Sequence, residues 1–309
     1  MCTAISYLCS DHYFGRTLDY EQSYGEEVVV TPRGFLQGQY ALLGIATVRE
    51  GMPLYYDAIN EKGLSMAGLL FAGNACYFPP RAGAKNIPSF ALIASLLGEC
   101  ANLSEARRWL EDCVITDQPF SADLPPSPLH WMVADRSGAL VVESTAAGLK
   151  VYENPIGVLA NNPPFDQQLT RLADYQHLSP ENPAPSMGLP LYSRGLGAVG
   201  LPGDYSSPSR FARAAFAKQN LRPAQKETER VGQFFHLMGA VEVPKGCLRV
   251  EGADAYTLYT SCANTDRGIY YYTTYENRRI SAVMLMGKES GNTLRRYSLG
   301  RKQDMGCIL

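Results

Sequence analysis

Met1-Cys2-Thr3-Ala4 is the stretch from which the architecture and the chemistry of this chain follow. Initiator methionine is normally removed when the second side chain is small, so Cys2 becomes the first residue and carries both a thiol and a free α-amine. An α-amine titrates near ~7.7 to 8.0 and a thiol near ~8.5, so the amine can take the thiol proton at neutral pH. Catalytic cysteines at chain N-termini use this pairing of nucleophile and base. The simpler interpretation is that Cys2 is a small apolar residue that starts a strand.

Composition limits the classes of function. The chain has 309 residues, of which 46% are hydrophobic and 19% charged, as is typical of a soluble globular enzyme, and we interpret 1–309 as one domain. The net charge of −2 argues against nucleic acid or an anionic membrane surface as a partner. No apolar run is long enough to span a membrane, and the start of the chain lacks the features of a signal peptide, so we expect a cytoplasmic protein.

The cysteines and histidines do not have the spacing of a metal site. The eight cysteines include no Cys-x-x-Cys pair, and the four histidines form no His-Glu-x-x-His motif. In a chain of this size in a reducing compartment, we expect free thiols that are mostly buried. The pattern supports neither a zinc site nor any other metal site.

Gly195-Leu196-Gly197-Ala198-Val199-Gly200 matches the dinucleotide-binding motif Gly-x-Gly-x-x-Gly. That motif requires a strand directly before it and a helix that opens within it. Here Pro190 precedes the motif, and Pro202 delays the next helix. We therefore interpret this segment as a glycine-rich loop beside a pocket.

Hydrophobic periodicity predicts an α+β fold. Strands are expected over 3–8, 27–31, 41–48, 65–71, 130–134, 140–143, 149–152, 157–160, 256–263, 268–275 and 280–286. Helices are expected over 89–97, 104–112, 165–175, 207–221 and 228–241, with Ser104 and Ser207 as caps of the second and fourth. Short connections favour antiparallel pairing, so we expect two stacked antiparallel sheets with helices on their outer faces.

Eight short motifs recur in this order in one family. They are Met1-Cys2-Thr3, Phe14-Gly15-Arg16-Thr17-Leu18-Asp19, Asn60-Glu61-Lys62-Gly63-Leu64, Leu129-His130-Trp131-Met132, Leu159-Ala160-Asn161-Asn162-Pro163, Gly200-Leu201-Pro202-Gly203-Asp204, Ser209-Arg210-Phe211 and Gly268-Ile269-Tyr270-Tyr271-Tyr272. The chain resembles the choloylglycine hydrolases, which comprise bile salt hydrolases and penicillin V acylases within the N-terminal nucleophile hydrolases. The resemblance implies a four-layer αββα sandwich, no metal or cofactor, and usually a homotetramer.

The resemblance also implies roles for five residues. Cys2 would be the nucleophile, Arg16 would lie beside its thiol, and Asp19 would hold the α-amine. Asn161 would donate its side-chain amide to the oxyanion, and Arg210 would complete the polar cluster. Without the resemblance, Arg16 and Asp19 are equally well explained as a surface ion pair, and Asn161 as a turn residue before a proline.

The oxyanion hole and the substrate site involve further positions. Leu70 occupies a position where bile salt hydrolases often have asparagine and penicillin V acylases tyrosine, and its backbone N–H would donate to the oxyanion. Position relative to Cys2 suggests an apolar acyl pocket lined by Leu18, Tyr24, Tyr56 and Phe120, and Arg194 is a candidate for the charged end of the leaving amino acid.

Taken with the resemblance, these residues predict hydrolysis of glycine- or taurine-conjugated bile acids through a thioester on Cys2. Penicillin V, or another N-acyl amide, is the alternative substrate. An inactive protein that binds bile acids or similar amphiphiles is the alternative outside enzymes. Attack of an amine on the thioester, in place of water, would form a new conjugate.

Overall fold

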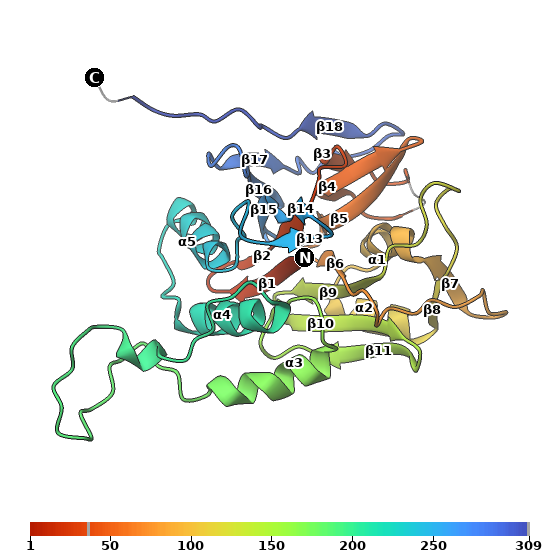
Figure 1. Ribbon diagram of the computed structural model, residues 1–309. Coiled ribbons are helices and arrows are strands. Elements are labelled where there is room, and N and C mark those ends of the chain that lie inside the picture. The colour runs from red at the N-terminus through yellow and green to blue at the C-terminus, as the bar shows by residue number, and fades with distance from the viewer. Residues whose placement is uncertain (36–37, 308–309) are drawn as a thin grey trace.

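The first strand of the chain lies inside a six-stranded antiparallel sheet. We describe residues 1–35 and 38–307 of a computed structural model (Figure 1). The strands of this sheet are, in spatial order, β12 (Val158–Leu159), β1 (Cys2–Leu8), β2 (His12–Tyr20), β15 (Tyr256–Asn264), β16 (Ile269–Thr274) and β17 (Ser281–Met284). Because β1 has a neighbour on each side, the position of Cys2 is set by strand pairing.

A second antiparallel sheet packs against the first. Its eight strands are, in spatial order, β11 (Gly148–Glu153), β10 (Gly138–Thr145), β9 (Leu129–Asp135), β6 (Ser65–Leu70), β5 (Met52–Asn60), β4 (Leu42–Arg49), β3 (Glu27–Thr31) and β18 (Arg295–Ser298). Side chains of both sheets belong to one buried cluster, for example Leu18 and Tyr259 of the first sheet with Ile59 and Met132 of the second. Burial of this apolar surface holds the two sheets together.

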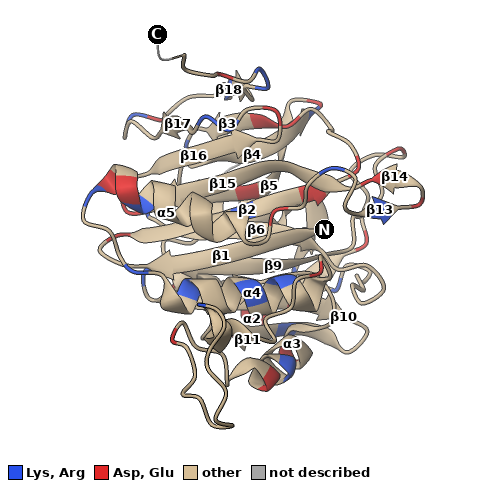
Figure 2. Ribbon diagram, turned by 60° about the vertical axis from the view of Figure 1, so that its left-hand side comes forward, with Lys and Arg blue, Asp and Glu red and all other residues tan. Residues whose placement is uncertain are grey.

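Helices cover the outer faces and make the predicted four-layer αββα sandwich. α4 (Ser207–Asn220) and α5 (Glu227–Gly239) lie in front of the strands of the six-stranded sheet in Figure 2, and Phe234 of α5 packs on Tyr13 at a ring-centroid distance of 6.4 Å. α1 (Leu92–Glu99) and α2 (Leu103–Glu111) cover the eight-stranded sheet through a second buried cluster, and α3 (Phe165–Leu172) packs beside α4. The predicted fold class is confirmed.

The remaining elements are short. β7 (Lys85–Pro88) pairs in parallel with β8 (Cys113–Thr116), and β13 (Arg249–Val250) pairs with β14 (Ala253–Asp254). The glycine-rich motif is part of an exposed loop with a single 3-10 turn, η3 (Leu196–Ala198), and helical segments precede it in the chain, with no strand directly before it. None of the described helices is both long and apolar enough to cross a bilayer.

Four details differ from the sequence prediction. β2 and β5 were not predicted as strands, although both are central in their sheets. α2 is capped by Asn102, whose side chain accepts a hydrogen bond from the Glu105 N–H, and Ser104 lies inside the helix. α4 begins at Ser207, so Ser206 is its cap residue. All eight cysteines are free thiols as predicted, but only four of them are buried.

His12 makes the stability of this fold depend on pH. Its ring is fully buried, and its two nitrogens contact the hydroxyls of Ser6 (2.8 Å) and Thr265 (2.7 Å). Burial lowers the pKa of His12 to about 4, whereas the unfolded chain titrates near its ordinary value of about 6.5. The unfolded state therefore binds the additional proton between these values, and the free energy of unfolding falls as pH is lowered from about 6.5 to 4, by up to about 3 kcal/mol.

Urea unfolding at several pH values checks this prediction. His12→Gln retains an amide that can bond both hydroxyls but cannot titrate, so its unfolding free energy should fall less steeply over the same pH range. A variant whose stability falls as steeply as that of the wild type would show that other groups cause the acid sensitivity.

Candidate active site

Cys2 lies at the first position of β1, and its side chain is only 3% exposed. Its backbone pairs with Leu18 of β2. Two residues earlier on β2, Arg16 donates a hydrogen bond from Nη2 to the Cys2 Sγ. A guanidinium beside a thiol favours the thiolate, which is the nucleophilic form of cysteine. The structure thus brings Cys2 and Arg16 into direct contact.

Arg16 joins the two sheets. The side chain is fully buried, and its Nη1 donates to the backbone carbonyls of Tyr56 on β5 (3.1 Å) and Gly68 on β6 (2.7 Å). Burial alone would lower the pKa of Arg16, but negative charge on the surrounding groups, Cys2 first among them, raises it above its ordinary value. The guanidinium therefore stays charged, and its carbonyl partners hold it in place beside the thiol.

Asp57 on β5 is a buried acid near Arg16 that sequence reasoning missed. Its carboxylate accepts hydrogen bonds from the hydroxyls of Tyr259 (2.6 Å), Tyr270 (2.5 Å) and Ser261 (3.0 Å). Burial raises the pKa of Asp57, and the charge of Arg16 and these three hydroxyls oppose that rise. Asp57 lies three residues before the quoted Asn60-Glu61-Lys62-Gly63 motif. If 52–60 had been predicted as a central strand, an acidic residue inside that strand would have drawn attention to Asp57.

Asp19 is also fully buried, near the end of β2. Its carboxylate accepts hydrogen bonds from the hydroxyls of Thr257 (2.6 Å) and Thr17 (3.3 Å), and Nη1 of Arg210 lies 3.9 Å from it. These partners balance the buried charge. The predicted contact of Asp19 with the Cys2 α-amine requires a chain that begins at Cys2. This structure includes Met1, so Cys2 has a peptide N–H and no α-amine.

The unprocessed N-terminus occupies the space beside Asp19. The Met1 α-amine donates a hydrogen bond to the Asp19 carbonyl, and the Asp19 N–H donates to the Met1 carbonyl at 2.8 Å. The Cys2 nitrogen is a peptide N–H here and donates to Oδ1 of Asn161 at 2.8 Å. Removal of Met1 would turn that nitrogen into an amine among Asp19 and Asn161.

Asn161 follows β12, and its side chain links three parts of the site. Oδ1 accepts hydrogen bonds from the Cys2 N–H and from Nη2 of Arg210 (2.7 Å). Nδ2 donates to the carbonyl of Leu70, the last residue of β6, at 2.7 Å. An amide nitrogen has two hydrogens, so one hydrogen of Nδ2 remains for another acceptor. The two predicted oxyanion donors, Asn161 and Leu70, therefore lie next to one another.

Arg210 reaches the site from the first turn of α4. Its side chain is fully buried, and Nη1 donates to the Cys2 carbonyl and to the Thr3 hydroxyl, both at 2.5 Å. Burial lowers the pKa of Arg210, and the charges of Asp19 and Cys2 oppose that effect. An arginine at a helix N-terminus is unfavourable for the helix itself. Here its contacts with β1 and Asn161 compensate by joining α4 to the site.

The five predicted substrate residues lie in different surroundings. Leu18 is buried opposite Cys2, and the carbonyl of Tyr56 binds Arg16 while its hydroxyl contacts Thr47 at 2.9 Å. The other three are on connections: Tyr24 is 41% exposed, Phe120 packs edge-on against Phe90, and Arg194 is exposed in the loop before η3. Leu18 and Tyr56 are thus beside Cys2 and Arg16, and the role of all five in substrate binding stays a prediction.

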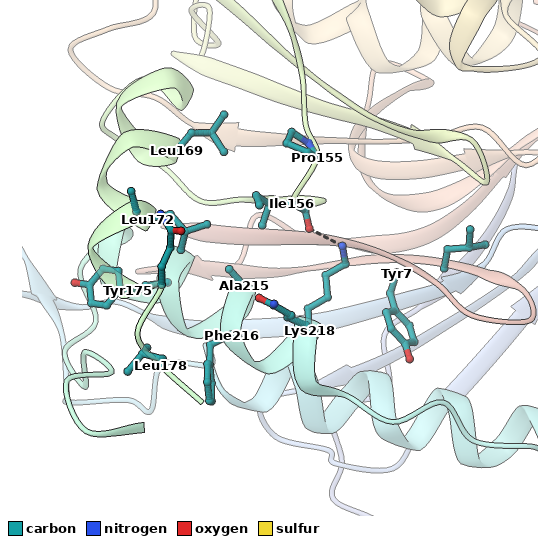
Figure 3. A pocket seen from close by; sticks show the side chains of 15 residues that line it. Tyr7, Pro155, Ile156, Leu169, Leu172, Tyr175, Leu178, Ala215, Phe216 and Lys218 are labelled. Carbon is teal, nitrogen blue, oxygen red and sulfur yellow. Dashed lines mark hydrogen bonds between the residues drawn. The ribbon is translucent and has the colours of Figure 1, made fainter. Parts of the chain in front are cut away.

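A groove of about 810 Å³ lies elsewhere, between the far end of β1, α3 and α4 (Figure 3). Tyr7, Leu172, Phe216 and Lys218 are among its lining residues, and the Lys218 ammonium donates to the Ile156 carbonyl at 2.5 Å. At ~3.3 Å per residue, Tyr7 lies roughly 17 Å along β1 from Cys2. None of the five predicted substrate residues lines this groove.

The chain is similar in sequence and structure to several named bile salt and conjugated bile acid hydrolases. The chain is 48% identical to a bile salt hydrolase/transferase from Lactiplantibacillus plantarum, over 92% of each chain. It superposes on the crystal structure of a mutant conjugated bile acid hydrolase from Clostridium perfringens with a TM-score of 0.92, at 34% identity and 100% coverage of both chains. A penicillin V acylase from Pectobacterium atrosepticum is 28% identical over 57% of this chain and 43% of its own.

The family model of "Linear amide C-N hydrolases, choloylglycine hydrolase family" matches residues 2–293. This range includes every site residue described above, from Cys2 at the first strand to Arg210 on α4. The chain therefore belongs to the choloylglycine hydrolase family of linear amide C–N hydrolases, as the sequence motifs predicted.

Proposed function

We propose that this protein is a bile salt hydrolase that cleaves the amide bond of glycine- or taurine-conjugated bile acids through the Cys2 thiol. Residues 1–309 would act as one N-terminal nucleophile hydrolase domain after removal of Met1. The observation that carries this proposal is the contact of Arg16 Nη2 with the Cys2 Sγ inside a fully buried polar cluster. The 48% identity to a named bile salt hydrolase/transferase supports the choice of substrate.

The first half of the reaction forms the thioester. The Cys2 α-amine takes the thiol proton, and the sulfur attacks the amide carbonyl of the substrate. The remaining N–H of Asn161 Nδ2 and the Leu70 backbone N–H donate to the tetrahedral oxyanion, and each such donor typically lowers the barrier by about 2.7–4 kcal/mol. The C–N bond then breaks, and the α-ammonium gives its proton to the departing nitrogen of glycine or taurine.

The second half returns the enzyme to its starting state. Water attacks the thioester carbonyl and loses a proton to the α-amine, and the Cys2 sulfur leaves and recovers the proton. Arg16 stabilises the thiolate when it leaves, and Asp19 keeps the α-amine in position. Arg210 contributes by fixing both the Cys2 carbonyl and the oxygen of Asn161. No step in this sequence calls for a metal or cofactor.

The test is release of free amino acid from glycocholate and taurocholate, measured beside release of 6-aminopenicillanic acid from penicillin V. Turnover of the bile salts supports the proposal, and the ratio of kcat/KM between them gives the preference for glycine or taurine. Turnover of penicillin V alone would assign the chain to the other substrate class. Tight bile acid binding without turnover of any substrate, in a chain shown by intact mass to lack Met1, would favour the inactive binder.

Transfer to amines is a second candidate activity. The name of the Lactiplantibacillus plantarum relative includes transferase, and an amine can replace water as the attacking group at the thioester carbonyl. Incubation of cholate conjugates with an excess of a different amino acid should then yield a new conjugate, detected by mass spectrometry. Finding only free bile acid at every amine concentration would remove this activity.

Assembly and location complete the proposal. We expect a homotetramer, and the exposed apolar side chains of Met187, Leu189 and Tyr192 on the loop before η3 are candidates for coverage by another subunit. Light scattering after gel filtration measures the mass, and a monomeric mass would refute the tetramer. Eight free thiols agree with a cytoplasmic location.

Asn161→Ala tests the oxyanion hole. We expect kcat for glycocholate to fall by about 10²- to 10³-fold, because the variant lacks one of two donors to the oxyanion. Iodoacetamide alkylation of Cys2 should fall much less than kcat, since Arg16 and the α-amine are retained and only the contact of Asn161 Oδ1 with the Cys2 nitrogen is lost. A parallel loss of alkylation would mean that Asn161 acts on the nucleophile and not on the oxyanion.

A further inference from the structure

A buried histidine–glutamate pair lies behind the proposed oxyanion hole, outside the five residues given catalytic roles. His130 of β9 and Glu143 of β10 are cross-strand neighbours, with 3.0 Å between His130 Nδ1 and Glu143 Oε1. Both side chains are completely buried. A pair of ionisable groups in this position requires an explanation, because an apolar pair of similar size is often as stable or more stable.

His130 contacts the segment that carries one oxyanion donor. Its imidazole stacks on the ring of Phe71, with ring centroids 4.3 Å apart and the planes 3° from parallel. Phe71 directly follows Leu70, and its N–H donates to the Pro128 carbonyl at 2.8 Å, two residues before His130. Phe71 is therefore fixed twice, by its backbone bond to Pro128 just before β9 and by its ring stack on His130 of β9. These two contacts also hold the end of β6 and the Leu70 peptide in place.

Glu143 contacts the segment that carries the other donor. Its Oε1 accepts a hydrogen bond of 3.0 Å from the backbone N–H of Phe165, the first residue of α3. The cap position of α3 is Pro164, which makes no side-chain cap bond, so Glu143 satisfies one of the unpaired N–H groups at that helix end. A carboxylate at a helix N-terminus is also favoured by the helix dipole.

α3 in turn holds the Asn161 loop. One turn into the helix, Gln168 Nε2 donates to the carbonyls of Asn161 and Pro163. Glu143 is thus linked to Asn161 indirectly: it binds the first residue of α3, and Gln168 of the same helix binds the Asn161 carbonyl. Both oxyanion donors, which come from distant parts of the sequence, depend on the same buried pair.

Within the described part of the chain, His130, Glu143 and Gln168 each also have a buried polar atom without a partner, which lowers the stability of the fold. These atoms are His130 Nε2, Glu143 Oε2 and Gln168 Oε1. A buried polar atom without a partner costs about 1–3 kcal/mol. Such costs are commonly retained at functional sites, where a defined geometry is required.

We propose that His130 and Glu143 form a positioning pair that sets the geometry of the oxyanion hole, His130 through Phe71 and Leu70, Glu143 through α3 and Asn161. The inference rests on the proposed function, since it assigns the pair to the same amide hydrolysis. The contacts of the pair are with Phe71 and with the first residue of α3, so in this proposal it acts only on the placement of the two donors.

Glu143→Leu is the first test variant, because leucine cannot accept the Phe165 N–H. We expect kcat for glycocholate to fall on the order of 10²-fold, the effect of a displacement of about 1 Å in an active site. KM should stay within a few-fold of the wild type, and the rate of Cys2 alkylation should be unchanged. Glu143→Gln keeps an acceptor for the Phe165 N–H and should restore most of kcat.

Glu289→Leu is the matched control. Among the described residues, Glu289 is another buried glutamate with one oxygen lacking a partner. Its hydrogen bonds there go to Arg33, Met286 and Arg295, the first residue of β18, and none of these belongs to the site. This variant should lose thermal stability and keep kcat per folded molecule. If Glu143→Leu does not fold, His130→Phe takes its place, since it keeps the ring stack and loses only the bond to Glu143. It should still lower kcat on the order of 10-fold, less than the roughly 10²-fold of a full 1 Å displacement.

The outcomes separate the two proposals. An active wild type with an equally active, folded Glu143→Leu would overturn the positioning pair and leave the proposed function intact. A loss of kcat that is matched by slower Cys2 alkylation, or by an equal loss in Glu289→Leu, would also overturn it. A wild type without activity on any of the three substrates would refute the proposed function, and the positioning role with it.

Discussion

Cys2→Ala is expected to lower the rate of glycocholate hydrolysis by about 10⁶-fold, the loss found when the nucleophile of a covalent hydrolase is removed. Alanine keeps the α-amine and the pairing of β1 with Leu18, but no atom remains to form the thioester. The measurement is glycine release over hours at high enzyme concentration. Electrospray mass spectrometry of the wild type, quenched during turnover, should in parallel detect an acyl group that the variant never carries.

The control for this variant concerns the seven other thiols. Alkylation with iodoacetamide should inactivate the wild type in proportion to modification of Cys2. Cys100, Cys113 and Cys262 should react slowly, because burial raises the pKa of these thiols and the thiolate is the form that is alkylated. The thermal midpoints of variant and wild type should be similar, since the change removes a single sulfur atom. Activity of Cys2→Ala within 100-fold of the wild type would assign the chemistry to another group.

Blocking the amine of Cys2 should inactivate the enzyme while its thiol remains in place. A chain that carries an N-terminal tag ending directly before Cys2 has a peptide nitrogen at that position, and a peptide nitrogen is not a base. Since a positioned general base contributes about 10²- to 10⁴-fold, we expect at least that loss in the tagged chain. Proteolysis that exposes Cys2 as the first residue should restore full activity in the same sample.

Intact mass and alkylation accompany this experiment. The mass shows what fraction of chains begins at Cys2, and activity should rise in proportion to that fraction. Met1 lies beside Asp19 in the structure, so the site has room for one preceding residue, and a folded but inactive chain is the expected starting state. Equal activity before and after proteolysis would exclude the α-amine as the base.

Sequence patterns predicted the strands and helices that have regular periodicity. The helices over 207–221 and 228–241 correspond to α4 and α5, and most expected strands are present within one or two residues. Two of the strands that were not predicted, β2 and β5, carry polar site residues: β2 contains Arg16 and Asp19, and β5 contains Asp57. These buried polar side chains interrupt the hydrophobic alternation by which a strand is recognised. The other strands that were not predicted are four residues long or shorter: β7, β8, β13, β14 and β18.

Asp57 and the pair of His130 and Glu143 were not singled out from the sequence for a related reason. A single acidic residue or histidine that is buried in the fold cannot be recognised as such from the sequence, because its hydrogen-bond partners lie on other strands. Tyr259 and Tyr270, which bind Asp57, are about 200 positions away in the chain. His130 stood inside a recognised motif, yet the motif contains no information about its contacts with Phe71 and Glu143.

The family and the four-layer fold could be read from the sequence, and the same motifs predicted Cys2 as the nucleophile. A small residue after Met1 predicts a processed N-terminus, and eight motifs in order are specific even though each is short. Tertiary structure alone decided which groups contact one another: Arg16 with Cys2, Arg210 with Asn161, and one buried pair behind both oxyanion donors. The physical reason is that strand pairing and sheet stacking bring together residues that are distant in the chain, and hydrogen bonding of buried charge then selects the partners.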